Sequence, residues 1–539
     1  MNLSKLHYPI QYNITLSNQT LIMKFNLIVA HSFPKYGIGL KGKLPWRLSK
    51  DMEHFKNITS DVGSGVSDPT FQYVNSVIMG RKTWESIPDK FRPLENRFNV
   101  IITNSPEKYS DKYINNNLVK FCRWDNLLQS IMNFMKSENR SLDGKIYQIS
   151  NHFIIGGSEI YNMALSQLEI ANIYTTEVYQ KGVEYDAHFP KINYNGENTQ
   201  FKQVKCGVFE WEKVSHERLY FRFMLYRNRK CCIDIETATI NKEEANYLSL
   251  MQYTLEHGLE REDRTGTGTI SSFGNQLRFN LADTFPLSTT KKMFFRAIFE
   301  ELMLYLRGQT DNGILVEKGI HIWDGNTSRE FLDKRGLTNY PVGDMGETYG
   351  FNFRHFGGKY ENCKTQYNNN DDNDNNNNGF DQLSECIKLI KEDPTSRRII
   401  INLWNPAGNT RAALPSCLCM YQFYVDTIHH KLNLQIYIRS SDYFLANNWN
   451  TCTGALLVHM ICRLSGINLT PGTLSVIIGD THLYKTHLEQ VRENLKREPY
   501  PFPMLLVKEV KDDITTFQFE DFELLGYKAH PRISADMAV

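Results

Sequence analysis

Two groups of motifs occupy separate halves of this chain of 539 residues, and a short polar tract lies between them. The first group runs from residue 44 to residue 161, and the second runs from 263 to 487. One hydrophobic core rarely serves a chain this long, so at least two domains are expected. We predict one domain at 24–228 and another at 244–539, joined by a short linker at 229–243.

The first half alternates strand-like runs with helical stretches, which is typical of an α/β domain. The strand-like runs lie at 25–33, 74–80, 97–103, 145–157, 170–178 and 218–227. In the second half, a helical stretch opens the domain, and residues 367–379 form a low-complexity tract rich in asparagine and aspartate. Such a tract cannot bury apolar surface, so we predict a solvated surface insertion there.

The composition excludes several classes of protein. The chain is 41% hydrophobic and 22% charged, as in globular proteins, and no apolar run approaches the roughly 20 residues that span a bilayer. A net charge of +1 gives no bulk attraction to nucleic acid or to a membrane, and ten irregularly spaced cysteines fit neither a zinc site nor a disulfide scaffold. Residues 1–23 form an extension without a secretory signal. We expect a cytoplasmic protein that holds no metal and requires no nucleic acid.

The motifs of the first half indicate a pocket for a flat ring and a dinucleotide. In LPWRLSKDMEHF, Asp51 and Phe55 share one face of a helix, where a carboxylate can hold a ring that the aromatic side chain covers. Taken alone, Asp51 also fits an ordinary acid in the first turn of a helix. GRKTWESI brings two cations and a hydroxyl to a helix entry, which favours phosphate. Gly156 and Gly157 lack Cβ atoms, so a ligand can approach their backbone closely.

The motifs of the second half indicate a thiol nucleophile and an anionic ligand. Cys417 follows the turn-like ALPS and leads into a strand, whereas Cys419 lies two residues deeper and is expected in the core. Arginine occurs in three separate motifs, DRTGTG, TSRR and IRSSD, and a phosphate dianion needs several such donors. Asn450 carries a carboxamide that can donate to O4 of uracil and accept from N3–H, whereas cytosine presents the reverse pattern.

In this order the motifs resemble the bifunctional dihydrofolate reductase–thymidylate synthase family, over nearly all of residues 24–539. The resemblance implies an α/β reductase-like domain with a mixed central sheet and flanking helices, followed by an α+β synthase-like domain. One implied reaction is the NADPH-dependent reduction of dihydrofolate to tetrahydrofolate. The other is the reductive methylation of dUMP by 5,10-methylenetetrahydrofolate, which gives dTMP and dihydrofolate. The resemblance also implies a homodimer formed through the synthase-like domain.

Within the reductase-like domain, the resemblance assigns the catalytic acid to Asp51. Phe55 packs on the folate, Arg97 binds its α-carboxylate and Thr176 supports the acid. The residues that the resemblance places at NADPH are Ala30, Gly39, Arg81, Lys82, Thr83, Thr103, Gly156, Gly157 and Tyr161. Asn104 stands where relatives often have an arginine near the 2′-phosphate, so the preference for NADPH depends on the two cations and on Thr103.

Within the synthase-like domain, the resemblance assigns catalysis to Cys417 as nucleophile, to Glu301 as the acid that manages protons, and to Tyr349 near C5 of uracil. The residues that it places at dUMP are Arg264, Arg397, Arg398, Arg439, Ser440, Asp442, Asn450, His482 and Tyr484. Those that it places at the folate are Trp323, Asn326 and Val539. In the family the adjacent arginine pair comes from the other subunit, so the phosphate site implies a homodimer.

The synthase-like half departs from the family pattern at one group of positions. Leu418 stands where relatives have a histidine directly after the nucleophile, and Ile438 stands where they have a glutamine. Residues 446–449 replace a loop that usually reads Gly-Leu-Pro-Phe. The first two changes remove polar groups from the surroundings of the nucleophile.

Two other functions stay open at this point. An active reductase fused to a pyrimidine hydroxymethylase is suggested by the altered loop, but hydroxymethyl transfer leaves tetrahydrofolate unoxidised and the reductase with nothing to regenerate. The second half could instead be a degenerate synthase-like module for dimerisation or RNA binding. The retained nucleophile, acid and base-reading amide argue against such a module, because a scaffold has no need of them.

Overall fold

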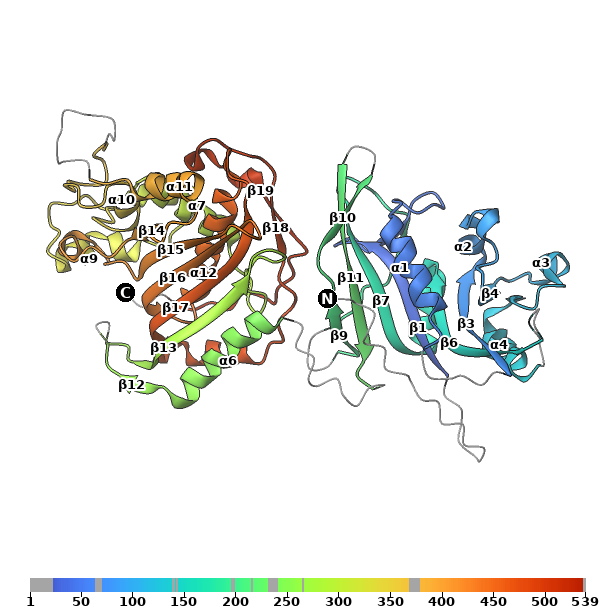
Figure 1. The fold of residues 1–539 in the computed structure, drawn as a ribbon. Helices are drawn as coiled ribbons and strands as arrows, with labels where there is room; N and C mark the ends of the chain where they lie inside the picture. Colours follow the sequence, from blue (N-terminus) through green and yellow to red (C-terminus); the bar gives the residue numbers. More distant parts are fainter. Residues whose placement is uncertain are drawn as a thin grey trace. The chain divides into compact units, whose positions relative to one another are not determined.

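In the computed structural model the chain forms two compact units, Met1–Ile240 and Asn241–Val539 (Figure 1). The structure describes residues 23–63, 70–137, 141, 144–194, 199–214, 217–230, 241–263, 266–367 and 379–536. Nearly all of the predicted N-terminal extension and surface insertion lies outside these residues, as do residues 231–240 of the predicted linker, Arg264 and Val539.

The first unit is built on a mixed sheet of nine strands, in the order β10-β11-β7-β1-β6-β3-β4-β5, with β9 also paired to β11. The strands are β1 (Lys24–Ser32), β3 (Phe71–Gly80), β4 (Arg97–Ile102), β5 (Val119–Cys122), β6 (Ile146–Gly156), β7 (Glu169–Tyr179), β9 (Phe201–Cys206), β10 (Glu210–Val214) and β11 (Glu217–Asn228). Strands β1 and β3 to β7 are parallel, and β9 to β11 add an antiparallel edge. A short ladder joins β2 (Gly37–Gly39) to β8 (Ala187–His188). This sheet confirms the predicted fold class.

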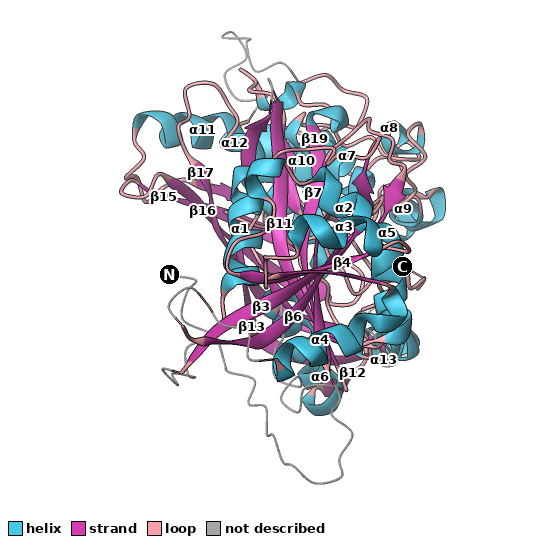
Figure 2. Cartoon of the chain, turned by 90° about the vertical axis from the view of Figure 1, so that its right-hand side faces the viewer, coloured by secondary structure: helices cyan, strands magenta, loops and turns pink. Residues whose placement is uncertain are grey.

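Helices cover the parallel strands of this sheet (cyan and magenta in Figure 2). Seven of the nine residues of β1 are buried, which is the pattern of a strand covered on both faces. The helices are α1 (Ser49–Ser60), α2 (Arg81–Ser86), α3 (Glu107–Ser110), α4 (Leu127–Lys136) and α5 (Ser158–Gln167), with 3-10 turns at Asp89–Phe91, Asp111–Tyr113 and Trp124–Asn126. On α4 the apolar residues recur at helical spacing, and Phe134 stacks on Phe98 of β4.

All six strands predicted for the first unit are present, and their ends differ from the prediction by at most three residues. The sequence does not predict β5, β9 and β10. β5 has only four residues, and β10 alternates half-buried with exposed positions at the edge of the sheet. Such short or polar strands form because a neighbour offers hydrogen bonds, so hydrophobic periodicity does not reveal them.

The second unit contains a six-stranded sheet in the order β12-β13-β17-β16-β15-β14, in which β16 and β17 are parallel and the other neighbours antiparallel. The strands are β12 (Leu259–Arg261), β13 (Thr269–Asn280), β14 (Ile400–Asn402), β15 (Leu418–Asp426), β16 (Lys431–Asp442) and β17 (Thr470–Tyr484), with a separate pair, β18 (Met504–Val507) and β19 (Phe522–Leu525). The helices are α6 (Lys242–His257), α7 (Phe295–Leu306), α8 (Gly313–Val316), α9 (Arg329–Lys334), α10 (Tyr349–Arg354), α11 (Gln382–Glu392), α12 (Asn447–Ile461) and α13 (Leu488–Leu495). The α+β prediction for this unit is confirmed.

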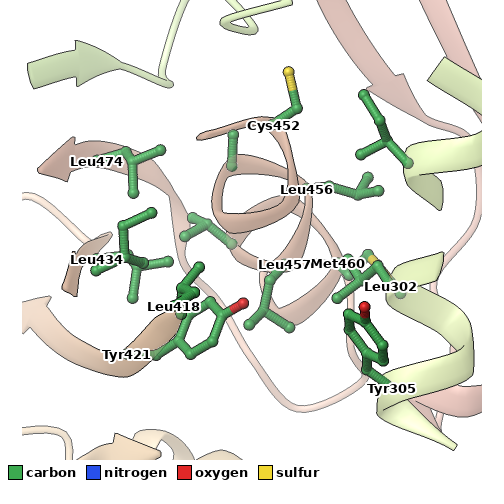
Figure 3. Packing of buried hydrophobic residues seen from close by; sticks show 14 of the residues in the cluster. Leu302, Tyr305, Leu418, Tyr421, Leu434, Cys452, Leu456, Leu457, Met460 and Leu474 are labelled. Atoms are coloured by element: carbon green, nitrogen blue, oxygen red, sulfur yellow. The ribbon is translucent and has the colours of Figure 1, made fainter. Parts of the chain in front are cut away.

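Helix α12 forms the centre of the second unit. Thirteen of its fifteen residues are buried, because the helix is apolar nearly all round and packs on every side. Leu457 of α12 belongs to the same core cluster as Tyr305 of α7 and Leu418 of β15 (Figure 3). The central helix thus connects the sheet to α7.

The other face of this sheet carries exposed side chains. The register aligns Met420, Tyr437 and Ile477 in a row across β15, β16 and β17, and none of the three is fully buried. Tyr424, further along β15, is 67% exposed. Large apolar and aromatic side chains gathered on one exposed face are typical of an interaction surface.

Two properties of the helices bear on the predicted domain limits and on membranes. α6 begins at Lys242, and the Asn241 side chain caps it by accepting from the Glu244 backbone N–H at 3.0 Å. The last two residues of the predicted linker are therefore helical. Among the helices of the described segments, none combines the length and apolar character needed to cross a bilayer.

Candidate active sites

A cavity of about 1830 Å³ lies in the first unit, at the carboxyl ends of its parallel strands. Ala30 of β1, Gly80 of β3 and Thr103 after β4 line it, together with the turn from β6 into α5. Open α/β sheets usually bind ligands at this edge. The cavity is lined by all thirteen predicted reductase-like site residues, namely Ala30, Gly39, Asp51, Phe55, Arg81, Lys82, Thr83, Arg97, Thr103, Gly156, Gly157, Tyr161 and Thr176.

Asp51 is the carboxyl group inside this cavity that can exchange a proton near neutral pH. It lies in the first turn of α1, and Thr176 of β7 donates a hydrogen bond from its hydroxyl to Asp51 Oδ1 at 2.7 Å. Loss of water on burial raises the pKa of Asp51 to about 6, although the Thr176 hydrogen bond opposes this rise. A fixed acid of this pKa is suited to protonate a bound ring.

Arg97 is a second charged group held in a fixed orientation. Its Nε donates to the Glu95 carbonyl at 3.0 Å, and its Nη1 donates to the Thr59 hydroxyl at 2.8 Å. Burial lowers the pKa of Arg97 from its usual value, and the group stays charged in any ordinary pH range. A guanidinium locked at the cavity wall can bind a carboxylate through two parallel hydrogen bonds.

The turn from β6 into α5 brings backbone unusually close to the cavity. The Gly156–Gly157 peptide bond is cis, and Gly156 has a φ of +122°. A Cβ atom at Gly156 would lie 3.3 Å from the Tyr161 hydroxyl, and one at Gly157 would lie 3.3 Å from Thr83 Oγ1. Both positions therefore require glycine or a shift of neighbours, and both leave the backbone open to a flat ligand.

In the second unit, Cys417 immediately precedes β15, as predicted from the sequence. Its backbone N–H donates to the Tyr349 hydroxyl at 2.8 Å, and Arg439 Nη2 lies 3.8 Å from its sulfur. The carbonyls of Ser416 and Pro415 each accept from Arg439 at 3.0 Å and so hold the guanidinium beside the thiol. A fixed cation at this place favours the thiolate, which is the nucleophilic form.

Glu301 is a buried acid on α7, and two indoles bind its carboxylate. Trp323 Nε1 donates to Oε1 at 2.8 Å, and Trp449 Nε1 donates to Oε2 at 2.6 Å. Burial raises the pKa of Glu301, and the hydrogen bonds from the two indoles oppose the rise. Asn326, which follows Trp323 by three residues, is also buried, and its Nδ2 has no partner among the described residues.

The carboxyl ends of β16 and β17 gather most of the other predicted nucleotide-binding residues. The parallel register places Asp442 opposite His482, and His482 packs edge-on against Tyr484. Ser440 precedes Asp442 on the same strand, and Asn450 follows in the first turn of α12. Asp442 also accepts from the backbone N–H groups of the turn that leads into this helix.

Arg397 and Arg398 are not brought to this cluster. Both are exposed between α11 and β14, and the register places them near Tyr424, at the opposite end of β15 from Cys417. Cys417 and Tyr424 are seven positions apart along the chain, which corresponds to on the order of 20 Å in a strand. Within one subunit these arginines cannot reach a phosphate held beside Cys417.

Comparison with known proteins assigns each unit to a family. A dihydrofolate reductase model matches residues 24–227, and a thymidylate synthase model matches residues 245–539. A putative bifunctional dihydrofolate reductase–thymidylate synthase of Oryza sativa is 38% identical, over 93% of this chain and all of the rice protein. The bifunctional proteins of Glycine max and Leishmania major are 38% and 35% identical, over 95% and 96% of this chain and 95% of each relative.

This chain belongs to the bifunctional dihydrofolate reductase–thymidylate synthase family. The first unit is thus its reductase unit, and the second is its synthase unit. Two predicted site residues, Arg264 and Val539, lie outside the described residues. The described segments contain no group of three or more His, Cys, Asp or Glu side chains that could hold a metal ion.

The departures from the family pattern are neighbours in the synthase unit. Leu418 and Ile438 face each other across β15 and β16, and they are 2% and 0% exposed. Both belong to the main core cluster. Leu418 and Ile438 therefore form an apolar contact in the core.

Trp449 is a site residue that sequence reasoning did not assign a role. The sequence shows only that an indole occupies a loop position where relatives carry phenylalanine. Its hydrogen bond to Glu301 joins residues 148 positions apart, so no local pattern could reveal it. The signal available in the sequence was the change from phenylalanine, whose ring has no hydrogen-bond donor, to tryptophan, whose indole has one.

We predict that Asp51→Asn stabilises the reductase unit at pH 8, because the amide keeps an acceptor for Thr176 and carries no buried charge. The folded pKa of about 6 exceeds the usual unfolded value of about 3.9, so ionisation destabilises the fold fully above pH 6 and not at all below pH 4. The two pKa values differ by about 2 units, and partial exposure limits the gain to about 1–3 kcal/mol.

Hydrogen exchange of residues 24–228 in the full chain measures this gain at pH 8, and urea unfolding at pH 8 and pH 5 tests its dependence on pH. Asp125→Asn is the matched control, since Asp125 is exposed in the same unit. If Asp51→Asn and the unmodified chain are equally stable at pH 8, burial of the Asp51 carboxylate does not cost free energy of folding.

Proposed function

We infer that this chain catalyses two consecutive reactions of dTMP synthesis. The synthase unit methylates dUMP with 5,10-methylenetetrahydrofolate, which gives dTMP and dihydrofolate. The reductase unit reduces that dihydrofolate to tetrahydrofolate with NADPH. Two observations carry this conclusion. Proteins named for both activities align with at least 93% of this chain, and each unit holds a separate polar site.

The reductase cavity fits a dinucleotide. The glycine pair leaves backbone that a nicotinamide ring can approach, and the tight Cβ distances at both glycines support this fit. We assign the phosphates to Arg81, Lys82 and Thr83 at the start of α2, and the 2′-phosphate to the two cations and Thr103. The remaining wall at the dinucleotide is assigned to Ala30, Gly39 and Tyr161. When bound, NADPH supplies a hydride.

Asp51 supplies the proton in our proposal for the reductase reaction. Its position beside Phe55 in α1 lets the carboxyl group hold the pterin while the aromatic ring packs on the folate. Thr176 donates to Oδ1 and thereby orients the carboxyl group. Arg97 binds the α-carboxylate of the folate, because its guanidinium is already held by Glu95 and Thr59.

Cys417 is the proposed nucleophile of the synthase reaction. Its thiolate adds to C6 of the uracil ring, and the electron pair of the C5–C6 bond moves toward O4. C5 then bonds to the methylene carbon of the folate as the bond from that carbon to N10 breaks. C5 loses its proton, and its electron pair expels N5 from the methylene carbon. The folate delivers a hydride to that carbon and leaves as dihydrofolate, while the C6–S bond breaks and restores the thiolate. Arg439 supports both the first and the last step, since it stabilises the thiolate.

The other synthase residues are assigned by what they can hold. Glu301 manages protons near O4, Tyr349 lies beside Cys417 and near C5, and Asn450 reads uracil. The phosphate is assigned to Arg264, Arg397, Arg398, Arg439 and Ser440, the rest of dUMP to Asp442, His482 and Tyr484, and the folate to Trp323, Asn326 and Val539.

We further propose a homodimer formed through the exposed face of the synthase sheet. Met420, Tyr437 and Ile477 present a partly apolar row there, and Arg439 lies on the same face two residues beyond Tyr437. A second copy packed on this face could therefore bring its own arginine pair next to Arg439. The distance between Arg398 and Cys417 within one chain supports this arrangement. A cytoplasmic location stays a prediction.

The direct test of both activities is the identification of products. Incubation of the full chain with dUMP and 5,10-methylenetetrahydrofolate should yield dTMP and dihydrofolate in equal amounts, and added NADPH should convert the dihydrofolate to tetrahydrofolate. Chromatography with mass detection measures all four species. Formation of 5-hydroxymethyl-dUMP without dihydrofolate would favour the hydroxymethylase, and an active reductase without any nucleotide product would favour the degenerate module.

We predict that Asp51→Asn lowers the reductase kcat at pH 7 by about a hundredfold or more and leaves dTMP formation unchanged, because only the proton donor is lost. In the unmodified chain the reductase rate should fall as the pH rises through about 6, since the donating form is then depleted. NADPH oxidation from pH 5 to pH 9 measures both effects. A normal rate in the variant would exclude Asp51 as the acid.

We predict that Cys417→Ser and Arg398→Ala each abolish dTMP formation and that a mixture of the two recovers it. After random subunit exchange, half of the dimers are mixed and each holds one intact site, so about a quarter of the normal activity should return. Cys417→Ser mixed with Arg439→Ala is the matched control. One subunit supplies both Cys417 and Arg439 to a site, so no mixed dimer then holds an intact site. Recovery in the control alone, or in neither mixture with exchange verified, contradicts the proposed dimer.

A further inference from the structure

The Glu301 carboxylate accepts one indole N–H on each oxygen. Trp323 reaches it from the segment after α8, and Trp449 reaches it from the first turn of α12. An indole N–H only donates and does not titrate in water, so neither donor is lost as the pH changes. Donors of this kind favour the ionised carboxylate and fix its plane.

The cross-strand pair at the start of β15 and on β16 offers no polar group to this acid. Leu418 and Ile438, the cross-strand pair on β15 and β16, are both buried and both apolar. The family pattern has a histidine and a glutamine at these two positions. In this chain, donors to Glu301 come instead from the helices and from the segment that carries Trp323.

The titratable groups that face Glu301 are phenols. Tyr305 lies one turn away on α7, Tyr349 begins α10, and Tyr421 lies on β15. Burial raises the pKa of each of these hydroxyls, so all three stay neutral over the range in which a carboxyl group titrates. None of the three is therefore an ion that competes with the two indoles for the Glu301 carboxylate.

Trp449 also connects two parts of the site that must act together. It is adjacent in sequence to Asn450, so its hydrogen bond ties α7, which carries the acid, to the turn of α12 that carries the base-reading amide. We propose that Trp449 is a positioning residue of the synthase site, which holds the Glu301 carboxylate in a fixed place relative to the base-reading amide of Asn450. This inference rests on the proposed synthase activity.

The test is the pH profile of dTMP formation by the full chain carrying Trp449→Phe, which keeps the ring and removes only the donor. Loss of a charge-assisted hydrogen bond should lower kcat by about tenfold to a hundredfold with little change in KM for dUMP. The limb of the profile that Glu301 controls should move to higher pH by about 1 unit, because the ionised carboxylate loses a donor. Trp323→Phe should act in the same direction.

Two controls separate positioning from a general effect on the fold. The reductase rate of the same preparation should be unchanged, since Trp449 belongs to the synthase unit and does not line the reductase cavity. Trp449→Phe should cause no further loss in a chain that already carries Glu301→Gln, because a residue that acts through Glu301 has nothing left to hold. An unchanged pH profile in an active variant, or full additivity with Glu301→Gln, overturns the inference alone. Absence of dTMP with the unmodified chain overturns the proposed synthase activity and the inference together.

Discussion

The acid of each site is a carboxyl group that the fold removes from water and surrounds with fixed hydrogen-bond donors. Burial of such a group costs free energy, and the cost is met by the packing of a large core around it. Asp51 receives a hydroxyl from Thr176 and has a pKa of about 6, so it exchanges a proton near neutral pH. Glu301 receives two indoles, which oppose the rise in its pKa that burial causes. In each site the other groups are arranged around this acid, and the pKa of the acid depends on its own burial and hydrogen bonds.

Local patterns in the sequence predict the reductase site well. The strand-like runs and the helix that carries Asp51 and Phe55 are short-range features, and the predicted residues all line one cavity of the unit that these elements build. The edge strands β9 and β10 could not be predicted in this way, since they depend on pairing with β11. Likewise, the contact of Trp449 with Glu301 depends on how α12 packs on α7, which no sequence period encodes.

The register between β15 and β16 gives a physical reason for the paired departures from the family. Had only Leu418 or only Ile438 been apolar, the remaining polar side chain would have been buried without its partner, which costs about 1–3 kcal/mol. Replacing both partners by apolar groups is nearly neutral, because no donor or acceptor is left unmatched. The two changes are therefore one structural event, and the core cluster around Leu418 and Tyr421 accommodates it without a polar gap (Figure 3).

The two sites differ in what one chain can supply. Every residue assigned to the reductase lies around a cavity within a single unit, so that site needs no second subunit. The synthase site lacks its arginine pair, because Arg397 and Arg398 lie at the far end of β15 from Cys417. The same strand order that separates them leaves Tyr437 and Ile477 only partly buried on the face that also carries Arg439. In the proposed homodimer a second copy would cover this face and supply the arginine pair, so the proposal concerns the synthase reaction and not the reductase reaction.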